Sequence, residues 1–150
     1  MIISNGVQAQ TVTSNLDQLK LMQTYVGTWQ RNIGNDTVDV WEVQQYENAF
    51  ISTTYRLING KKSFLLTENW GFSSEENNFK GFTLFYNGLI STWIASFTTE
   101  KKWIVYTLVN FNPKKVTTKI ELTFETPTKI IAVTYRNGVK TREIDWSKIK

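Results

Sequence analysis

The stretch YVGTW at residues 25–29 ends a short helical pattern and begins a long series of alternating apolar and polar residues. Gly27 lets the backbone turn tightly from helix into strand, and the ring of Trp29 then enters the end of the core that follows. About ten alternating segments come after it, separated by short turns. Such a series is typical of an antiparallel up-and-down β-barrel, because hairpin-sized connections join neighbouring strands.

The alternation predicts where the strands lie. Asn59-Gly60 and Asn137-Gly138 are strong signals for type I′ hairpin turns between them. A β-sandwich is the main alternative, but it usually includes longer crossover connections than this chain offers. The predicted fold class is therefore all-β, an up-and-down barrel of 8–10 strands with a short N-terminal helix. We expect strands over residues 27–33, 37–46, 49–58, 62–72, 79–87, 89–98, 102–111, 115–125, 128–136 and 139–146.

The N-terminal segment, residues 1–13, has no helical or strand periodicity. We interpret it either as a disordered start or as the remnant of a signal peptide, since VQAQ at residues 7–10 is similar to the end of a cleavable signal. The protein is accordingly expected to be secreted or periplasmic, with a cytoplasmic location as the alternative. Residues 14–150 form the predicted barrel domain. Ser14 can cap a helix over residues 15–25, with Asp17 near its positive end. The helix carries an apolar stripe: Leu16, Leu19, Met22 and Val26.

Composition excludes several classes of protein. The 150 residues contain no Cys and no His, which excludes Cys nucleophiles, disulfides, His-dependent triads and His-ligated haem. No apolar run approaches the ~20 residues that span a bilayer, so we expect no membrane span. The formal charge of +4 includes lysine pairs at residues 61–62, 101–102 and 114–115, all at predicted turns or strand ends. We interpret these as solvated hairpin ends, not as a site for nucleic acid or anionic lipid.

The helix, Gly27-x-Trp29 and the meander that follows resemble the lipocalin-like (calycin) proteins. Phe111-Asn112-Pro113 before a long penultimate hairpin is similar to small bacterial secreted lipocalin-like domains. The resemblance implies a barrel with a cavity for small, largely apolar ligands. The chain departs from typical lipocalins in having about ten expected strands and no Cys. Fatty-acid-binding proteins carry two helices between their first strands, which this sequence lacks.

Strand alternation also predicts which polar side chains face the interior. Glu68 shares a face with Phe64, Leu66, Trp70 and Phe72, and Arg31 shares one with Trp29. For residues 49–58, the face that carries Arg56 competes with the face that carries Tyr55. Inward charges are costly unless they are paired, hydrogen-bonded or hydrated. We interpret them either as head-group contacts for a ligand or as an Arg–Glu pair that satisfies itself. The predicted ligand-binding residues are Arg31, Arg56, Glu68, Trp70, Trp93 and Tyr106.

The predicted function is non-enzymatic binding of a small apolar or amphipathic molecule. We expect no cofactor, no metal, no catalytic residue and no nucleic-acid partner, and these features do not fix the oligomeric state. The alternative function is a surface interaction module whose barrel is filled by side chains and holds no ligand. Pocket volume separates the two, because a filled interior leaves no room for a ligand.

Gly27, Trp29 and Arg142 are predicted to be structural. If the meander closes, residues 139–146 lie beside residues 27–33, and we expect the face of Lys140, Arg142, Ile144 and Trp146 to turn toward the barrel end. The resemblance implies that a basic side chain late in the chain stacks over the first-strand tryptophan. We therefore predict that Arg142 covers the ring of Trp29.

Overall fold

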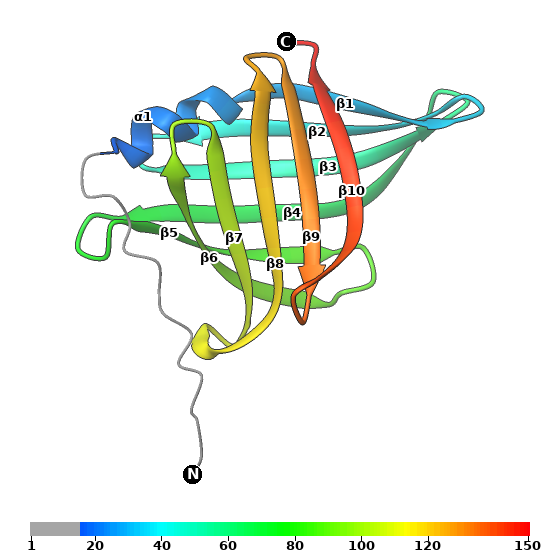
Figure 1. Ribbon diagram of the computed structural model, residues 1–150. Helices are drawn as coiled ribbons and strands as arrows, with labels where there is room; N and C mark the ends of the chain where they lie inside the picture. The colour runs from blue at the N-terminus through cyan, green and yellow to red at the C-terminus, as the bar shows by residue number, and fades with distance from the viewer. Residues whose placement is uncertain (1–15) are drawn as a thin grey trace.

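The computed structural model describes residues 16–150, which form a closed antiparallel barrel of ten strands with one short helix (Figure 1). The predicted fold class is confirmed. The segment 1–13 and the expected cap Ser14 lie outside the described residues. The elements, in chain order, are α1 (Gln18–Met22), β1 (Gly27–Gly34), β2 (Thr37–Tyr46), β3 (Ala49–Ile58), β4 (Lys61–Ser73), β5 (Asn78–Phe85), β6 (Ile90–Thr99), β7 (Lys102–Val109), β8 (Asn112–Thr126), β9 (Lys129–Arg136) and β10 (Val139–Lys148).

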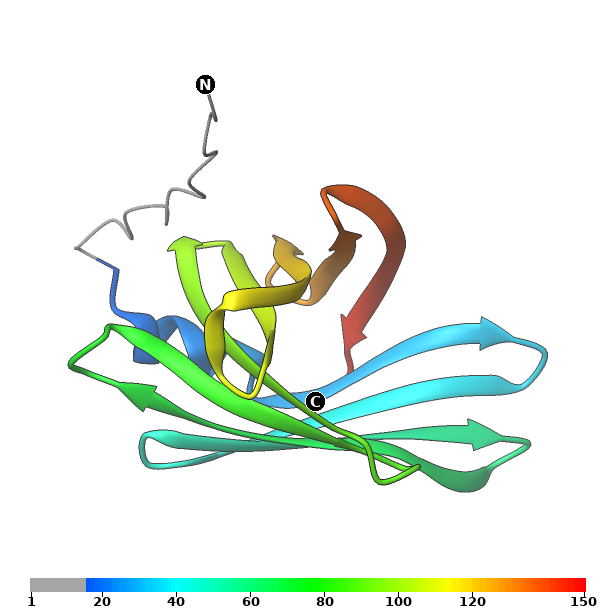
Figure 2. The same ribbon diagram turned by 90° about the horizontal axis from the view of Figure 1, so that it is seen from below.

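Each strand pairs with its neighbours in sequence, and β1 pairs with β10 to close the barrel. Because the connections alternate between the two ends, the turns β1–β2, β3–β4, β5–β6, β7–β8 and β9–β10 all lie at one end. We call this the mouth end. The other end, which α1 covers, is the helix end (Figures 1 and 2).

The two predicted type I′ turns lie at the mouth end. Asn59 and Gly60 have φ of 48° and 76°, and Asn137 and Gly138 have 50° and 77°. Positive φ at both central residues is what this turn requires, and its twist matches that of the flanking strands. These turns fix the register of β3 with β4 and of β9 with β10.

Helix α1 is shorter than predicted, because one 3₁₀ turn, Gln23–Tyr25, follows it. Asp17 is the N-cap, and its carboxylate accepts a hydrogen bond from the backbone N–H of Lys20 at 3.0 Å. The predicted apolar stripe faces the barrel: Met22 is fully buried, and Leu16, Leu19 and Val26 pack against the core. Gln18 is also buried, and its side-chain amide exchanges hydrogen bonds with the backbone N–H and C=O of Phe97 at 2.7 and 3.1 Å. This amide fastens α1 to β6.

Gly27 makes the junction between helix and strand possible. Its φ is +130°, and a Cβ at this position would lie 2.3 Å from the backbone oxygen of Lys150. The C-terminal residues lie close to Gly27 because the Thr28 N–H donates to Lys150 O at 2.9 Å and the Ile149 N–H donates to Thr28 O at 2.8 Å. This geometry leaves no room for a side chain at Gly27.

Replacing Gly27 with alanine is expected to lower the free energy of unfolding by about 3 kcal/mol, from backbone strain together with the displaced C-terminus. Gly88→Ala is the matched control, because Gly88 also has positive φ (+81°) but has nothing within 4 Å of its added Cβ. The control should lose only about 1–2 kcal/mol. Urea unfolding of both variants measures the difference, and equal losses would contradict a close approach at Gly27.

The seam between β1 and β10 differs from the prediction. The strands pair only through Trp29 with Lys148 and Gln30 with Ser147, near the helix end. Toward the mouth they diverge, with β1 running along the barrel and β10 crossing it (Figure 1). The basic group over Trp29 is therefore Lys148, whose Nζ lies 5.2 Å from the ring centroid, and the prediction for Arg142 is wrong. The physical reason is that β10 continues past residue 146, so the residues facing Trp29 come from its end.

The helix end of the barrel is filled by aromatic side chains. Trp29, Tyr25, Phe50, Phe79 and Phe97 are fully buried there. Tyr25 contacts the rings of Trp29, Trp41, Trp103 and Phe124 at centroid distances of 4.7–6.5 Å. Large buried rings supply much of the apolar area that stabilises a core. This half of the barrel is therefore filled by side chains, as the alternative function requires of the whole interior.

A β-bulge in β4 corrects one face assignment. Thr54 pairs with Leu66 and Tyr55 pairs with Phe64, so Leu65 is an extra residue in β4. The bulge turns Phe64 to the outside, where it is 46% exposed, although the alternation had placed it inward with Leu66. An extra residue shifts the alternation of everything on one side of it.

Candidate functional site

A cavity of about 390 Å³ occupies the mouth half of the barrel. Most of its wall is apolar, and four tryptophans contribute to it. Arg142, one of the lining residues, is exposed to solvent. The apolar lining is Trp41, Leu65, Leu66, Trp93, Trp103, Val105, Ile120, Leu122, Ala132, Ile144 and Trp146, and the polar lining is Arg31, Asp39, Thr54, Arg56, Glu68, Thr134 and Arg142.

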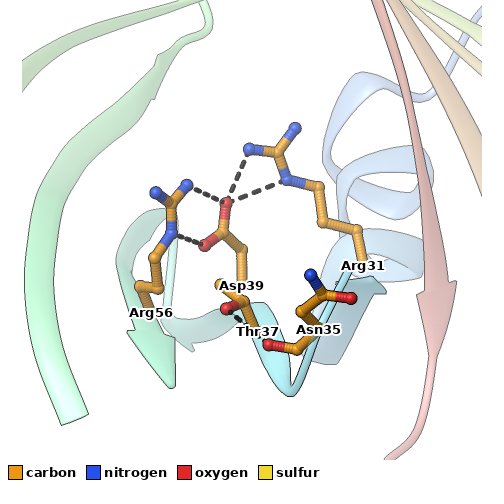
Figure 3. Close-up of polar contacts among 5 residues, drawn as sticks. All are labelled: Arg31, Asn35, Thr37, Asp39 and Arg56. Atoms are coloured by element: carbon orange, nitrogen blue, oxygen red, sulfur yellow. Dashed lines mark hydrogen bonds and ion pairs between the residues drawn. The ribbon is translucent and has the colours of Figure 1, made fainter. Parts of the chain in front are cut away.

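Two of the predicted arginines meet on one carboxylate at the mouth side of the cavity (Figure 3). Arg31 donates from Nε and Nη2 to Asp39 Oδ2 at 3.0 and 2.6 Å. Arg56 donates from Nε to Asp39 Oδ1 at 2.7 Å and from Nη2 to Oδ2 at 3.1 Å. We call these three residues the Arg–Asp–Arg cluster. The competition between the faces of β3 is settled, because Ser52 and Thr54 are buried and Arg56 lines the cavity.

Asp39 is fully buried and stays ionised because of its two partners. Burial works to raise the pKa of the carboxyl, but the hydrogen bonds and charges of Arg56 and Arg31 outweigh it and lower the pKa below its ordinary 3.8. The same hydrogen bond raises the pKa of Arg56. Asp39 uses the Nε and Nη2 atoms of both guanidinium groups, which leaves the Nη1 atom of each free of the carboxylate.

Arg31 also contacts the aromatic wall. Its guanidinium carbon lies 5.2 Å from the ring centroid of Trp146. Its side chain is only 11% exposed, against 34% for Arg56. Arg31 is thus held in position by a carboxylate and by a ring.

Glu68 lies deeper in the barrel, away from the arginines. Ser52 Oγ donates to its Oε2 at 3.1 Å and Thr83 Oγ1 donates to its Oε1 at 3.3 Å. Within residues 16–150 no cation forms an ion pair with it, so of the two interpretations the self-satisfied Arg–Glu pair is wrong. Burial raises the pKa of the Glu68 carboxyl, and the two hydroxyl hydrogen bonds only partly offset this. Part of the side chain still faces the cavity.

The raised pKa of Glu68 predicts how stability depends on pH. The folded state binds the Glu68 proton more tightly than the unfolded chain does. The stability that this proton contributes is therefore fully present below the ordinary pKa of 4.5 and is lost as pH rises through the pKa of the folded state. Glu68→Gln should remove this loss, and thermal unfolding from acid to neutral pH measures it. Glu100→Gln, at an exposed turn, is the control and should retain the wild-type slope. An unchanged slope in Glu68→Gln would contradict the assignment.

The remaining predicted residues are only partly brought together. Trp93 lines the cavity, and its indole N–H donates to Thr83 Oγ1 at 3.2 Å. Trp70 faces inward but lies in the filled core, where it stacks on Phe50 at 5.6 Å. Tyr106 is not among the cavity-lining residues, because Trp103 and Val105 take the inner face of β7 and Tyr106 takes the outer one. Arg142, predicted to be structural, lines the cavity and forms no ion pair with residues 16–150.

Asp39 is the residue that the sequence analysis missed. It stands two positions before Trp41 and four before Val43, so the alternation that places those side chains inside also places Asp39 there. The register adds its partners, because Asp39 pairs directly with Arg31 on β1 and with Arg56 on β3. The signal was therefore present in the sequence.

No protein-family model matches this chain, and comparison with curated proteins finds no match. The structure defines the class: a closed, ten-stranded antiparallel β-barrel, which is compatible with a calycin-like fold. Over residues 16–150 no helix is long and apolar enough to cross a membrane. In the same part of the chain, no group of acidic side chains is placed to hold a metal ion.

Proposed function

We propose that the protein is a lipocalin-like binder that holds a small amphipathic molecule in the mouth cavity without chemical turnover. The observation that carries this proposal is the cavity itself, which combines an apolar wall with one cluster of fixed polar groups. Ligand sites are typically concave and mostly apolar, with a few polar groups that orient the ligand. At the ~30 Å³ that one water occupies in the liquid, the volume suits about a dozen non-hydrogen atoms.

The charges of the lining favour an anionic head group. Arg31, Arg56 and Arg142 contribute three guanidinium groups, against the carboxyls of Asp39 and Glu68. Because burial raises the pKa of Glu68, its proton is held more tightly and it offsets less of this positive charge. Free guanidinium N–H groups beside an apolar wall suit a carboxylate on an apolar body, since Arg binds planar anions through paired N–H groups.

The site gives little support to catalysis. Glu68 contacts only hydroxyl groups, and Glu42 accepts a hydrogen bond from the Tyr55 hydroxyl at 3.0 Å on the outer face. Within residues 16–150 each of these carboxyls hydrogen-bonds only to neutral hydroxyl groups, and no histidine, thiol or second carboxyl joins them to form a paired acid and base. We therefore propose a binding function.

A bulky side chain placed in the cavity tests the binding site directly. Thr134 lines the cavity, whereas the next residue toward the N-terminus, Val133, lies on the outer face of β9. Thr134→Phe should abolish the rise in unfolding temperature that octanoate gives the wild-type protein, and Val133→Phe should preserve it. Native mass spectrometry of the same samples counts bound ligand. Octanoate binding that survives in Thr134→Phe would place the ligand elsewhere and contradict the proposal.

A further inference from the structure

Exposed apolar side chains gather at one side of the cavity mouth. Phe64, Tyr86, Leu89, Ile90 and Phe111 are 46, 72, 64, 68 and 47% exposed. They come from the β3–β4, β5–β6 and β7–β8 hairpins, whose turns all lie at the mouth end. We call these five residues the mouth patch. Monomeric soluble proteins rarely expose such a group unless it meets a partner or a membrane.

Hydrogen bonds between the three hairpins show that the mouth patch is continuous. The Tyr86 N–H donates to Leu65 O at 2.8 Å, which places the β5–β6 turn beside Phe64. Ile90 pairs with Leu84 across the same hairpin. The Phe111 N–H donates to Thr92 Oγ1 at 2.9 Å, which folds the β7–β8 turn onto the strand that starts at Ile90.

The charge at the tips of the three hairpins that form the mouth patch has one sign. Lys61 and Lys62 precede Phe64 on β4, and Lys114 and Lys115 follow Phe111 on β8. Residues 59–66, 84–92 and 109–117 contain no Asp or Glu. Turns at the helix end carry acidic residues instead: Glu47, Glu75, Glu76 and Glu100. These three hairpin tips are therefore basic and apolar, and Asp36, whose backbone oxygen accepts from the Asn59 N–H at 3.1 Å, lies in the neighbouring β1–β2 turn.

We propose that the mouth patch docks onto the surface of an anionic lipid bilayer. Aromatic and aliphatic side chains on separate hairpin tips can enter the boundary between head groups and acyl chains, and flanking lysines attract anionic lipid. Lysine suits this role because its flexible apolar stem follows buried surface while its ammonium stays in the head-group layer. An acidic protein partner would also complement the positive charge of the lysines. The five side chains of the mouth patch, however, offer no directional hydrogen-bonding group except the Tyr86 hydroxyl.

Docking in this orientation would place the cavity at the bilayer surface. Leu65 and Leu66, which adjoin Phe64 on β4, line the cavity. A lipid-soluble amphiphile could then enter the barrel without crossing bulk water. The docking itself does not depend on the proposed cavity ligand.

Flotation of the protein with vesicles tests the docking, and no ligand is added. The wild-type protein should float with vesicles of phosphatidylcholine mixed with phosphatidylglycerol, and much less with phosphatidylcholine alone. Lys114→Gln/Lys115→Gln should weaken binding about 25-fold, at about fivefold for each lysine near an anionic surface. Leu89→Ser/Ile90→Ser should weaken it as well, because the apolar tips no longer insert. Circular dichroism confirms that each variant is folded.

The matched control removes the same charge from the other end of the barrel. Lys20 lies on α1 and Lys101 in the β6–β7 turn, and both are exposed at the helix end. Lys20→Gln/Lys101→Gln should change binding by less than about threefold, since charges beyond the Debye length of ~10 Å from the surface are screened. Equal losses in the two double variants would mean attraction by net charge without orientation. That result, or a wild-type protein that floats with neither vesicle, would overturn the proposal while leaving octanoate binding in the cavity as a separate question.

Discussion

Trp29→Ala is expected to lower the free energy of unfolding by about 3–5 kcal/mol, as removal of a large buried ring typically does. Trp29 is fully buried, and its indole N–H donates to Tyr25 O at 2.8 Å. Its ring also contacts Trp41 and Phe124 at 6.3 and 5.9 Å between centroids. The truncation removes apolar contacts, leaves a buried carbonyl without its donor, and opens the only seam at which β1 meets β10.

Double-mutant cycles test whether Lys148 or Arg142 lies over the ring of Trp29. Lys148 Nζ lies over the ring and also donates to Thr24 O at 3.2 Å, so Trp29→Ala and Lys148→Met should be coupled by about 0.5–2 kcal/mol. Trp29→Ala and Arg142→Ala should be additive, because Arg142 lies at the cavity mouth. Trp29→Phe supplies a milder variant if the alanine protein does not fold. Coupling of Trp29 with Arg142 and none with Lys148 would contradict the pairing of β1 with β10 described above.

Asp39→Asn is expected to lower the free energy of unfolding by about 3 kcal/mol in the absence of ligand. The substitution keeps the shape of the side chain but leaves the guanidinium groups of Arg31 and Arg56 without their shared anion. The expected loss lies at the lower end of the range for broken buried pairs, because the Arg56 side chain is 34% exposed. Octanoate should restore part of the loss, since its carboxylate can supply the missing negative charge through the Nη1 atoms that Asp39 does not use.

The low pKa of Asp39 gives the same prediction a pH signature. The stability that ionised Asp39 contributes is present above the ordinary pKa of 3.8 and is lost as pH falls through the lower pKa of the folded state. The wild-type protein should therefore lose this stability in acid, and Asp39→Asn should not. Asp145→Asn, on the exposed face of β10, is the control and should stay within about 0.5 kcal/mol of wild type. An Asp39→Asn protein as stable as wild type would mean that the cluster does not hold the arginines.

The fold could be predicted from the sequence because alternation and turn residues agree along the whole chain. Asn59-Gly60 and Asn137-Gly138 fix two hairpins through their positive φ, and the strand ranges follow from period two. The seam could not be predicted in the same way, because pairing of β1 with β10 depends on how the whole barrel curves. That is why Lys148, and not Arg142, faces Trp29.

The candidate site was predictable in part for the same reason. Arg31, Arg56 and Glu68 face inward as their strands require, but alternation gives a face and not a partner. Asp39 is identified as the partner of both arginines only by the register of three strands. The separation of Glu68 from the arginines depends on how deep each side chain lies in the barrel. The bulge at Leu65, which no sequence signal marks, reversed the face of Phe64.

Calorimetric titration of wild-type protein with octanoate, octanol and octylamine near neutral pH tests the central claim most directly, because the three molecules share one apolar chain and differ in the head group. Three arginines against two carboxyls, one of which has a raised pKa, favour the carboxylate. Octanoate should bind about 10- to 100-fold more tightly than octanol, as one or more hydrogen bonds to a charged group allow, and octylamine should bind most weakly. Octanol binding as tightly as octanoate, or no binding by any of the three, would contradict an anion-binding cavity.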